Sequence, residues 1–274
     1  MVMECNGPAF DDAALARRDL SRVKILCLYD TSVTNAGIQL LRSARRLREL
    51  HIASTLITDE AIEIVRDLPA LDELSIYAPR ITDAGIAILG GAGELYSLNL
   101  SGTQLTDEGL SSLSRLKKVE VIVLNDTQVT DEGTSVLQSW SLLRTVSLKR
   151  TRVTGSRLAG LPNNDHFLLY LDGSPIVDDG IVAMAKTLAS LKLLSMVETP
   201  ITDVALRALS GLQKLDELLI RNTHVTDDGV DSLRGLPRLE RLDLRGTQIS
   251  NDCIAALKAA NRRLRILLPG EAQE

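Results

Sequence analysis

Aromatic residues are scarce in this chain of 274 residues, at 3% of the total, whereas hydrophobic residues make up 45%. The composition therefore predicts an aliphatic core built from Leu, Ile and Val. No uninterrupted apolar run approaches the ~18–20 residues of a membrane span. The start, MVMECNGPAFDD, has neither the basic nor the apolar region of a Sec signal peptide. These absences predict a cytoplasmic protein with no membrane partner.

Cysteine is also rare. Cys5, Cys27 and Cys253 stand alone in the chain, without a CxxC motif or a paired framework. We expect free thiols in a reducing compartment. The charge balance is mild, because 31 Lys and Arg face 36 Asp and Glu, a net charge of −5. This balance argues against a broad nucleic-acid or anionic-membrane surface, so nucleic acid is not an expected partner.

The familiar catalytic motifs are missing. The sequence has no P-loop and no GxGxxG, HExxH or GxSxG motif. His51, His166 and His224 are widely separated in the chain, so a common metal or catalytic site formed by them is not expected. We therefore predict no enzymatic activity, no cofactor and no metal.

A repeat is the dominant feature of the sequence. The segment Leu95–Lys118 reads LYSLNLSGTQLTDEGLSSLSRLKK, and in-phase copies of it recur along the chain. They start at Val23, Leu47, Leu71, Leu95, Val119, Leu143, His166, Leu191, Leu215 and Leu239, and a partial copy starts at Leu264. The interval is 24 residues, except for 23 before His166 and 25 before Leu191 and Leu264. A fixed period of this length indicates a solenoid, which we interpret as one elongated domain.

Each repeat divides into a strand and a helix. The fourth and sixth places, such as Leu98 and Leu100, point to the same side of a short strand and are predicted to face inward. From the sixteenth place apolar residues recur at three-residue spacing, as in Leu110 and Leu113, which indicates a short helix with one buried stripe. Strands stack at ~4.8 Å, whereas packed helices need ~8–10 Å. The array should therefore curve, with strands on the concave face and helices on the convex face.

Small or polar residues recur between the strand and the start of the helix. In most repeats a Thr-Asp pair such as Thr106-Asp107 precedes the helix and suits its N-terminus, although the sequence leaves open which of the two is the cap. Gly at the fifteenth place, as at Gly109, predicts a close backbone approach between neighbouring coils. Thr at the ninth place, as at Thr103, is expected to satisfy backbone groups of the turn after the strand.

From Val23 to about Leu268 these features resemble the leucine-rich repeat. They are most similar to the branch with Cys at the ninth place followed by I-T-D-x-G-L, which occurs in ribonuclease-inhibitor-like arrays and in F-box proteins. Here Thr replaces that Cys, a variant that looks bacterial. The resemblance implies an α/β fold, a curved leucine-rich-repeat solenoid. It also implies a scaffold for protein binding, although the family binds unrelated partners.

The ends and one repeat depart from the pattern. Residues 1–22 are predicted to form a capping segment with a helix after Asp11, residues 23–263 ten repeats, and residues 264–274 a partial repeat and tail. Pro269 would fall at the inward sixth place and end the pairing. Repeat six has Gly155 where Asp is usual, which indicates either drift at an internal seam or a kink beside a binding site. Trp140 is interpreted as core filling.

The third, fifth and seventh places of the strands should line the concave face. From repeat five to repeat nine these places are largely apolar and are flanked by Arg and Lys. The predicted partner-binding residues are Val121, Val123, Lys149, Arg150, Leu168, Tyr170, Leu193, Val197, Leu219 and Arg221. An apolar patch with a polar rim suits a protein interface, although aliphatic residues also favour strands for their own sake.

We therefore predict a monomeric, non-catalytic module that binds a protein on its concave face. Two alternatives stay open. The first is substrate recognition in a ubiquitin-ligase-type complex, which the resemblance to F-box proteins implies, although residues 1–22 are too short for an F-box. The second is a structural spacer within a longer protein. Neither the partner nor the biological process can be read from the sequence.

Overall fold

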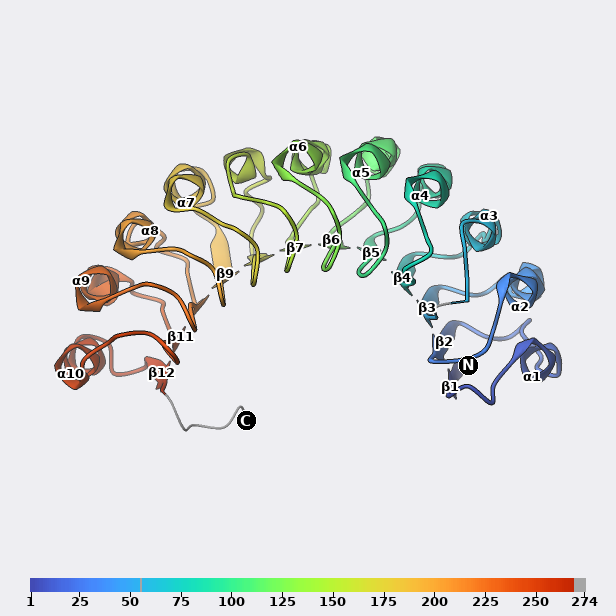
Figure 1. Cartoon of the computed structure of the whole chain (residues 1–274), viewed down its shortest axis with the longest axis horizontal. Coiled ribbons are helices and arrows are strands. Elements are labelled where there is room, and N and C mark those ends of the chain that lie inside the picture. Colours follow the sequence, from blue (N-terminus) through green and yellow to red (C-terminus); the bar gives the residue numbers. More distant parts are fainter. Residues whose placement is uncertain (55, 269–274) are drawn as a thin grey trace. The chain divides into compact units, whose positions relative to one another are not determined.

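The structure, a computed structural model, describes residues 1–54 and 56–268. The chain forms two compact units. The first unit comprises Met1–Val129 with Ser139–Leu143, and the second comprises Thr130–Gln138 with the chain from Arg144 onward. Within each unit parallel strands line the concave side and short helices cover the convex side (Figure 1). The α/β leucine-rich-repeat fold predicted from the sequence is confirmed.

The first unit alternates strands and helices along the chain. Its strands are β1 (Val2–Asn6), β2 (Ile25–Tyr29), β3 (Glu49–Ala53), β4 (Glu73–Tyr77), β5 (Ser97–Asn99) and β6 (Val121–Val123). Its helical segments are α1 (Asp12–Ala16), α2 (Asn35–Gln39), η1 (Leu40–Ser43), α3 (Glu60–Arg66), α4 (Asp83–Leu89), α5 (Asp107–Ser112) and η2 (Leu113–Arg115), where η marks a 3-10 helix. Equivalent places of consecutive repeats lie opposite each other, as Leu50 and Leu74 do.

The second unit follows the same plan. Its strands are β7 (Thr145–Ser147), β8 (Phe167–Tyr170), β9 (Leu191–Ser195), β10 (Glu217–Leu219), β11 (Arg241–Asp243) and β12 (Arg265–Leu267). Its helical segments are α6 (Asp131–Thr134), η4 (Leu158–Gly160), α7 (Asp178–Ala185), α8 (Asp203–Leu209), α9 (Asp227–Asp231), η5 (Ser232–Gly235) and α10 (Asn251–Ala260), and η3 (Ser135–Ser139) follows α6 in the chain. Leu218 lies opposite Leu194 on one side and Leu242 on the other.

The inward places carry the core, as the strand pattern predicts. Leu98 and Leu100 are fully buried, and so are Leu194 and Leu218 in the second unit. Trp140 is also fully buried, which confirms its interpretation as a core residue. Its indole Nε1 has no hydrogen-bond partner among the described residues. Successive side chains of a strand point to opposite faces of the sheet, so the buried leucines leave the other face of each strand to half-buried residues, both polar and apolar.

The structure decides which residue of the Thr-Asp pair is the helix cap. Thr106 is the N-cap of α5, and its Oγ1 accepts a hydrogen bond of 3.3 Å from the amide of Glu108. The aspartate of most Thr-Asp pairs acts on the next repeat instead: Asp83 Oδ1 accepts from Thr106 N at 2.8 Å, and Asp83 Oδ2 accepts from Thr106 Oγ1 at 2.5 Å. The same pairing joins Asp12 to Thr34, Asp59 to Thr82, Asp131 to Thr154, Asp178 to Thr202, Asp203 to Thr226, and Asp227 to Ser250. We call this arrangement the aspartate ladder. In repeat two Asp59 rather than Thr58 is the N-cap residue of α3, without a side-chain cap bond.

The recurrence of glycine at the fifteenth place follows from the aspartate ladder. A Cβ placed on Gly109 would lie 2.1 Å from Asp83 Oδ1, and one on Gly229 would lie 2.2 Å from Asp203 Oδ1 and 2.8 Å from Asp203 Cα. The expected close approach is therefore mainly between a glycine and the aspartate of the preceding repeat. Most ninth-place threonines behave as predicted, as Thr103 does, whose Oγ1 donates to the carbonyl of Leu100 at 2.8 Å. Thr31 is an exception, because its buried Oγ1 has no hydrogen-bond partner among the described residues.

Repeat six is the least regular part of the second unit. The helix expected there is replaced by the short segment η4. Gly155 has a φ of +100°, and a Cβ on Gly180 would lie 2.8 Å from Gly155 Cα. Two backbones therefore meet at this point, and only glycine at both positions leaves room for them. The next strand, β8, carries a register shift between Phe167 and Leu168, which absorbs the 25-residue interval before Leu191.

The two ends add detail that the repeat pattern does not contain. The helix after Asp11 is present as α1, but the sequence analysis missed β1, which pairs along its whole length with β2. The capping role of residues 1–22 stays a prediction. At the other end β12 confirms a further strand. Its Ile266 lies opposite Leu242, whereas a partial repeat that starts at Leu264 would place Leu267 there, so the register is one residue earlier than predicted. Pro269 lies outside the described residues.

Candidate functional site

The predicted partner-binding residues fall on both units. Val121 and Val123 belong to β6 of the first unit, and the other eight belong to the second. In the second unit Leu168, Tyr170, Leu193 and Leu219 alternate along their strands with fully buried residues, so they point away from the core. All four are half-buried. The face of β8, β9 and β10 that carries them is the candidate site, called here the β8–β10 face.

Apolar and polar residues interleave on the β8–β10 face. Leu168 lies opposite Leu193, and Tyr170 lies opposite Ser195. On the next strand Glu217 lies opposite Leu193, and Leu219 lies opposite Ser195. The apolar side chains therefore form a patch broken by Ser195 and Glu217 rather than the continuous strip that the sequence suggested.

A polar network forms one border of this patch. Lys149 Nζ lies 2.8 Å from Asp172 Oδ2 and 4.9 Å from the centroid of the Tyr170 ring, within cation–π range. Asp172 Oδ1 accepts from the amide of Val197 at 3.0 Å and from the hydroxyl of Ser195. Burial, with the nearby carboxylates of Glu217 and Asp172, raises the pKa of Tyr170. Asp172 thus holds Lys149 in place over the ring of Tyr170.

The opposite border consists of ion pairs. Arg221 is 3.5 Å from Glu198, and Arg241 is 3.3 Å from Glu217. Arg245 holds the buried Asp243 with two contacts, Nε to Oδ1 at 2.9 Å and Nη2 to Oδ2 at 2.6 Å. Burial of Asp243 acts to raise its pKa, but the hydrogen bonds and charge of Arg245 outweigh burial and hold that pKa below its ordinary value.

The sequence analysis missed the acidic partners of these cations. Lys149 and Asp172 occupy the seventh place of consecutive repeats, and Arg241 and Glu217 occupy the third place of consecutive repeats. Opposite charges at one place of adjacent repeats are the signal that could have identified these pairs, because such side chains are cross-strand neighbours. Arg150 is exposed and adopts a positive φ of 51° at the turn after β7.

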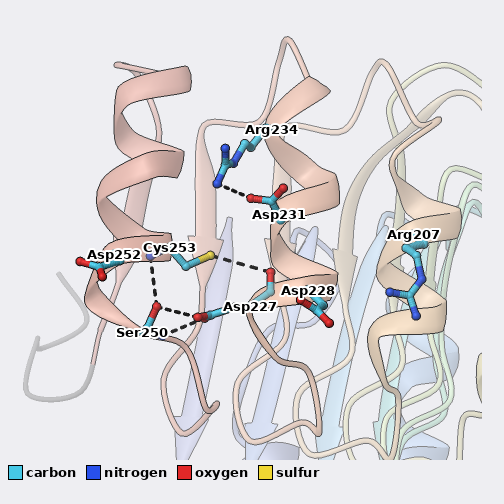
Figure 2. Close-up of a pocket in the computed structure, with 8 residues that line it drawn as sticks. All are labelled: Arg207, Asp227, Asp228, Asp231, Arg234, Ser250, Asp252 and Cys253. Atoms are coloured by element: carbon cyan, nitrogen blue, oxygen red, sulfur yellow. Dashed lines mark hydrogen bonds and ion pairs between the residues drawn. The ribbon is translucent and has the colours of Figure 1, made fainter.

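The helix side of the second unit carries an acidic hollow beside α8, α9 and α10 (Figure 2). Its lining residues are Arg207, Asp227, Asp228, Asp231, Arg234, Ser250, Asp252 and Cys253. Hydrogen bonds from the Ser250 hydroxyl and amide lower the pKa of Asp227, and Asp231 pairs with Arg234. Burial raises the pKa of the Cys253 thiol, so this cysteine is not an activated nucleophile. The aspartate ladder accounts for Asp227, and surface pairing accounts for Asp231 and Arg234.

A second cluster lies on the concave side of the first unit. His51 Nε2 is 4.0 Å from Glu49 Oε2 and 3.9 Å from Glu73 Oε1. The sequence predicts Glu49, His51 and Glu73 on a partly acidic part of the concave face, but not as a cluster. The repeat register places Glu49 opposite Glu73, which is the signal that could have found this cluster.

Parallel strands that alternate with short helices, one pair in most repeats of 23–25 residues, define a leucine-rich-repeat fold. The comparisons with known proteins agree with this class. A family model described as "Leucine Rich repeat" matches residues 95–114, the segment on which the repeat was recognised. No helix in the described part of the chain is long and apolar enough to cross a membrane.

Two solved structures of similar fold come from Listeria monocytogenes. An internalin is 20% identical over 92% of this chain and 82% of its own, with a TM-score of 0.58. An internalin C2 is 25% identical over 86% of this chain and 84% of its own, with a TM-score of 0.49. No curated protein matches the chain. The first likeness shows the fold alone, so the ribonuclease-inhibitor-like branch and the bacterial origin stay predictions.

Proposed function

We propose that the chain is a non-catalytic protein-interaction module, and that a partner protein binds to the β8–β10 face of the second unit. One observation carries the proposal. Leu168, Leu193 and Leu219 are half-buried on the side of the strands opposite to the core. The face of a strand that points away from the core is usually polar. Apolar groups surrounded by a polar rim are typical of the centre of a protein interface.

The residues at the borders of the β8–β10 face favour binding of a specific partner over nonspecific apolar association. Tyr170 and the arginines are residue types that are enriched at binding hot spots. Tyr170 is fixed by Lys149, and Arg241 by Glu217, so these side chains lose little freedom on binding. A partner would bury the leucines and exchange or extend the existing ion pairs.

Val121 and Val123 stay in the proposal as a separate apolar position on the first unit. Both are half-buried on β6 and flank the buried Ile122. No feature of the described residues favours substrate recognition in a ubiquitin-ligase-type complex. The monomeric state and a reducing compartment belong to the proposal too, and the free thiols of all three cysteines support the second.

A quantitative pull-down tests the proposal. The wild type and a Leu193→Gln/Leu219→Gln variant are used as baits in parallel, and captured proteins are compared by mass spectrometry. A Val177→Gln/Val204→Gln variant is the matched control, because both valines are 45% exposed in the second unit and lie outside its strands. Glutamine adds no charge, so general electrostatics stay unchanged.

The expected result is a protein that the wild type and the control variant retain and that the leucine variant loses. Equal capture by all three baits would contradict the proposal and favour the structural spacer. Loss with both variants would show that exposed apolar residues in general, and not the β8–β10 face, hold the captured protein. A circular-dichroism melt of each bait verifies that the variants are folded.

A further inference from the structure

The cluster on the first unit combines three metal-ligating side chains from two neighbouring strands. Glu49 and His51 are two residues apart on β3, so they point to the same side, and Glu73 lies opposite Glu49 on β4. The alternating Leu50 and Leu74 are fully buried, which places the three side chains on the concave side. One ligand atom from each residue lies within 4.8 Å of the other two.

The charges of this cluster are not balanced by lysine or arginine. Glu49 and Glu73 are like charges at directly opposite positions of adjacent strands, an arrangement that destabilises a sheet. Among the residues that the structure describes, neither carboxylate forms an ion pair with a lysine or arginine, and His51 is the basic group beside both. Arg48, the nearest basic residue in the sequence, is paired with Asp72. A bound cation would remove the repulsion between the two carboxylates.

One carboxylate is already oriented toward the histidine. Tyr96 OH donates to Glu73 Oε2 at 2.9 Å, while the other oxygen, Oε1, is the one that faces His51 Nε2. Outer partners of this kind hold the ligands of metal sites in position. Half-exposed glutamates can also rotate without disturbing the core: side-chain exposure is 35% for Glu49 and 27% for Glu73.

We propose that Glu49, His51 and Glu73 bind a divalent transition-metal ion of the zinc type, through His51 Nε2 and one oxygen of each glutamate. Two ligands that bind one ion at ~2.1 Å lie ~3.4 Å apart in tetrahedral geometry. The distances of 3.9 and 4.0 Å from His51 Nε2 to the glutamate oxygens exceed this value by about 0.5 Å, and all three ligand atoms lie within 4.8 Å of one another, so rotation of the half-exposed glutamates has to bring their oxygens closer together. Imidazole selects zinc and its neighbours over calcium and magnesium, which prefer oxygen ligands alone.

Three protein ligands leave a further coordination position for water or for a group of a bound molecule. The site lies in the first unit, so it is independent of the function proposed for the β8–β10 face. The test is isothermal titration of the metal-free full chain with zinc chloride at pH 7.5. The variants are His51→Ala, Glu73→Gln and Tyr96→Phe, with Glu63→Gln as the matched control. Glu63 is an exposed residue of α3 on the helix side of the same unit.

One zinc site is expected in the wild type and in Glu63→Gln. Loss of an outer partner of a metal ligand typically weakens metal binding ~10–100-fold, so Tyr96→Phe should weaken zinc binding by that factor. His51→Ala and Glu73→Gln remove a ligand itself and should weaken zinc binding at least as much. The Glu73→Gln side chain keeps the size of glutamate, so this variant tests the site even where His51→Ala fails to fold. Equal zinc affinity in the wild type and Glu73→Gln would overturn the proposal. Calcium binding as tight as zinc binding would overturn the transition-metal assignment.

Discussion

At the scale of single residues, the same side-chain types serve different purposes according to the neighbour they meet. Asp83 and Asp243 are both hydrogen-bonded aspartates with different partners. Asp83 accepts a hydrogen bond from a threonine of the next repeat, whereas Asp243 accepts one from the guanidinium of Arg245 in its own repeat. Asp83 joins two repeats, and Asp243 neutralises a charge on the concave side. The difference is one of position in the repeat, because each place has its own set of neighbours.

The pair of Asp243 and Arg245 makes stability depend on acid. The pKa of Asp243 is lowered in the folded chain, so the folded state holds its proton less tightly than the unfolded state, where the value is ~3.9. The stabilisation is therefore complete above pH ~4 and is lost as pH falls through the lower, folded-state pKa. We expect Asp243→Asn to cost ~1.5–3 kcal/mol at pH 7, the range for hydrogen bonds to charged groups.

Urea unfolding of the wild type and Asp243→Asn between pH 7 and pH 3 measures this effect. The difference in unfolding free energy between the two proteins should shrink below pH ~4, because the wild type loses the interaction that the variant already lacks. Asp228→Asn, a change of the same kind at an exposed aspartate of α9, is the control. A difference that stays constant down to pH 3 would show that the charge of Asp243 is not responsible.

At the scale of elements, helices are short and gain their order from neighbouring repeats. The α6 helix has four residues and α9 has five, lengths at which an isolated helix is not stable in water. The Thr130 side chain caps α6 at its N-terminus. The side chain of Thr226 makes no cap hydrogen bond at α9, and Asp203 of the aspartate ladder holds Thr226 instead. The ladder gives the aspartates that precede helices a structural role, since their oxygens accept hydrogen bonds from the next repeat.

The glycines beside the ladder give a test of this packing. Gly229→Ala should destabilise the chain by ~1–3 kcal/mol, because the new methyl group would overlap Asp203, including its Cα. Thermal and urea unfolding measure the loss. Gly235→Ala is the matched control, since a Cβ there meets no atom within 4 Å, and it should change stability by less than ~0.5 kcal/mol. Equal effects of the two substitutions would mean that α9 moves aside at no cost.

At the scale of the whole molecule, each unit has its own aliphatic core, and the cysteines are among the buried residues. Cys5, Cys27 and Cys253 are all free and buried. Burial raises the pKa of each thiol, so reactive thiolate is disfavoured in the folded chain.

We expect the native chain to react only slowly with a thiol reagent such as Ellman's reagent at pH 7.5. After denaturation in guanidinium chloride without reductant, all three cysteines should react. The native and denatured samples are compared in one assay, with the reduced chain as the reference for complete reaction. A titre below three in the denatured sample would indicate a disulfide, and fast reaction of the native chain would contradict the burial of the thiols.

The sequence by itself determined the features that depend on spacing within one repeat. Leu98 and Leu100 could be placed inside because side chains of a strand alternate, and Thr103 could be assigned to its turn because its hydrogen bond stays within three residues. The positions of most repeat helices followed from the three-residue apolar spacing, although repeat six has η4 where a helix was expected. Such features are local, so periodicity alone reveals them.

Only the tertiary structure decided the features that depend on which repeats meet and how side chains turn. The sequence did not distinguish cap from ladder in the Thr-Asp pair, because the partner of Asp83 is 23 residues away. It did not show the extra strand β1, the pairing of Lys149 with Asp172, or the cluster of Glu49, His51 and Glu73. The physical reason is that stacking in register brings residues one repeat apart into contact, and rotamers then select which of them bind each other.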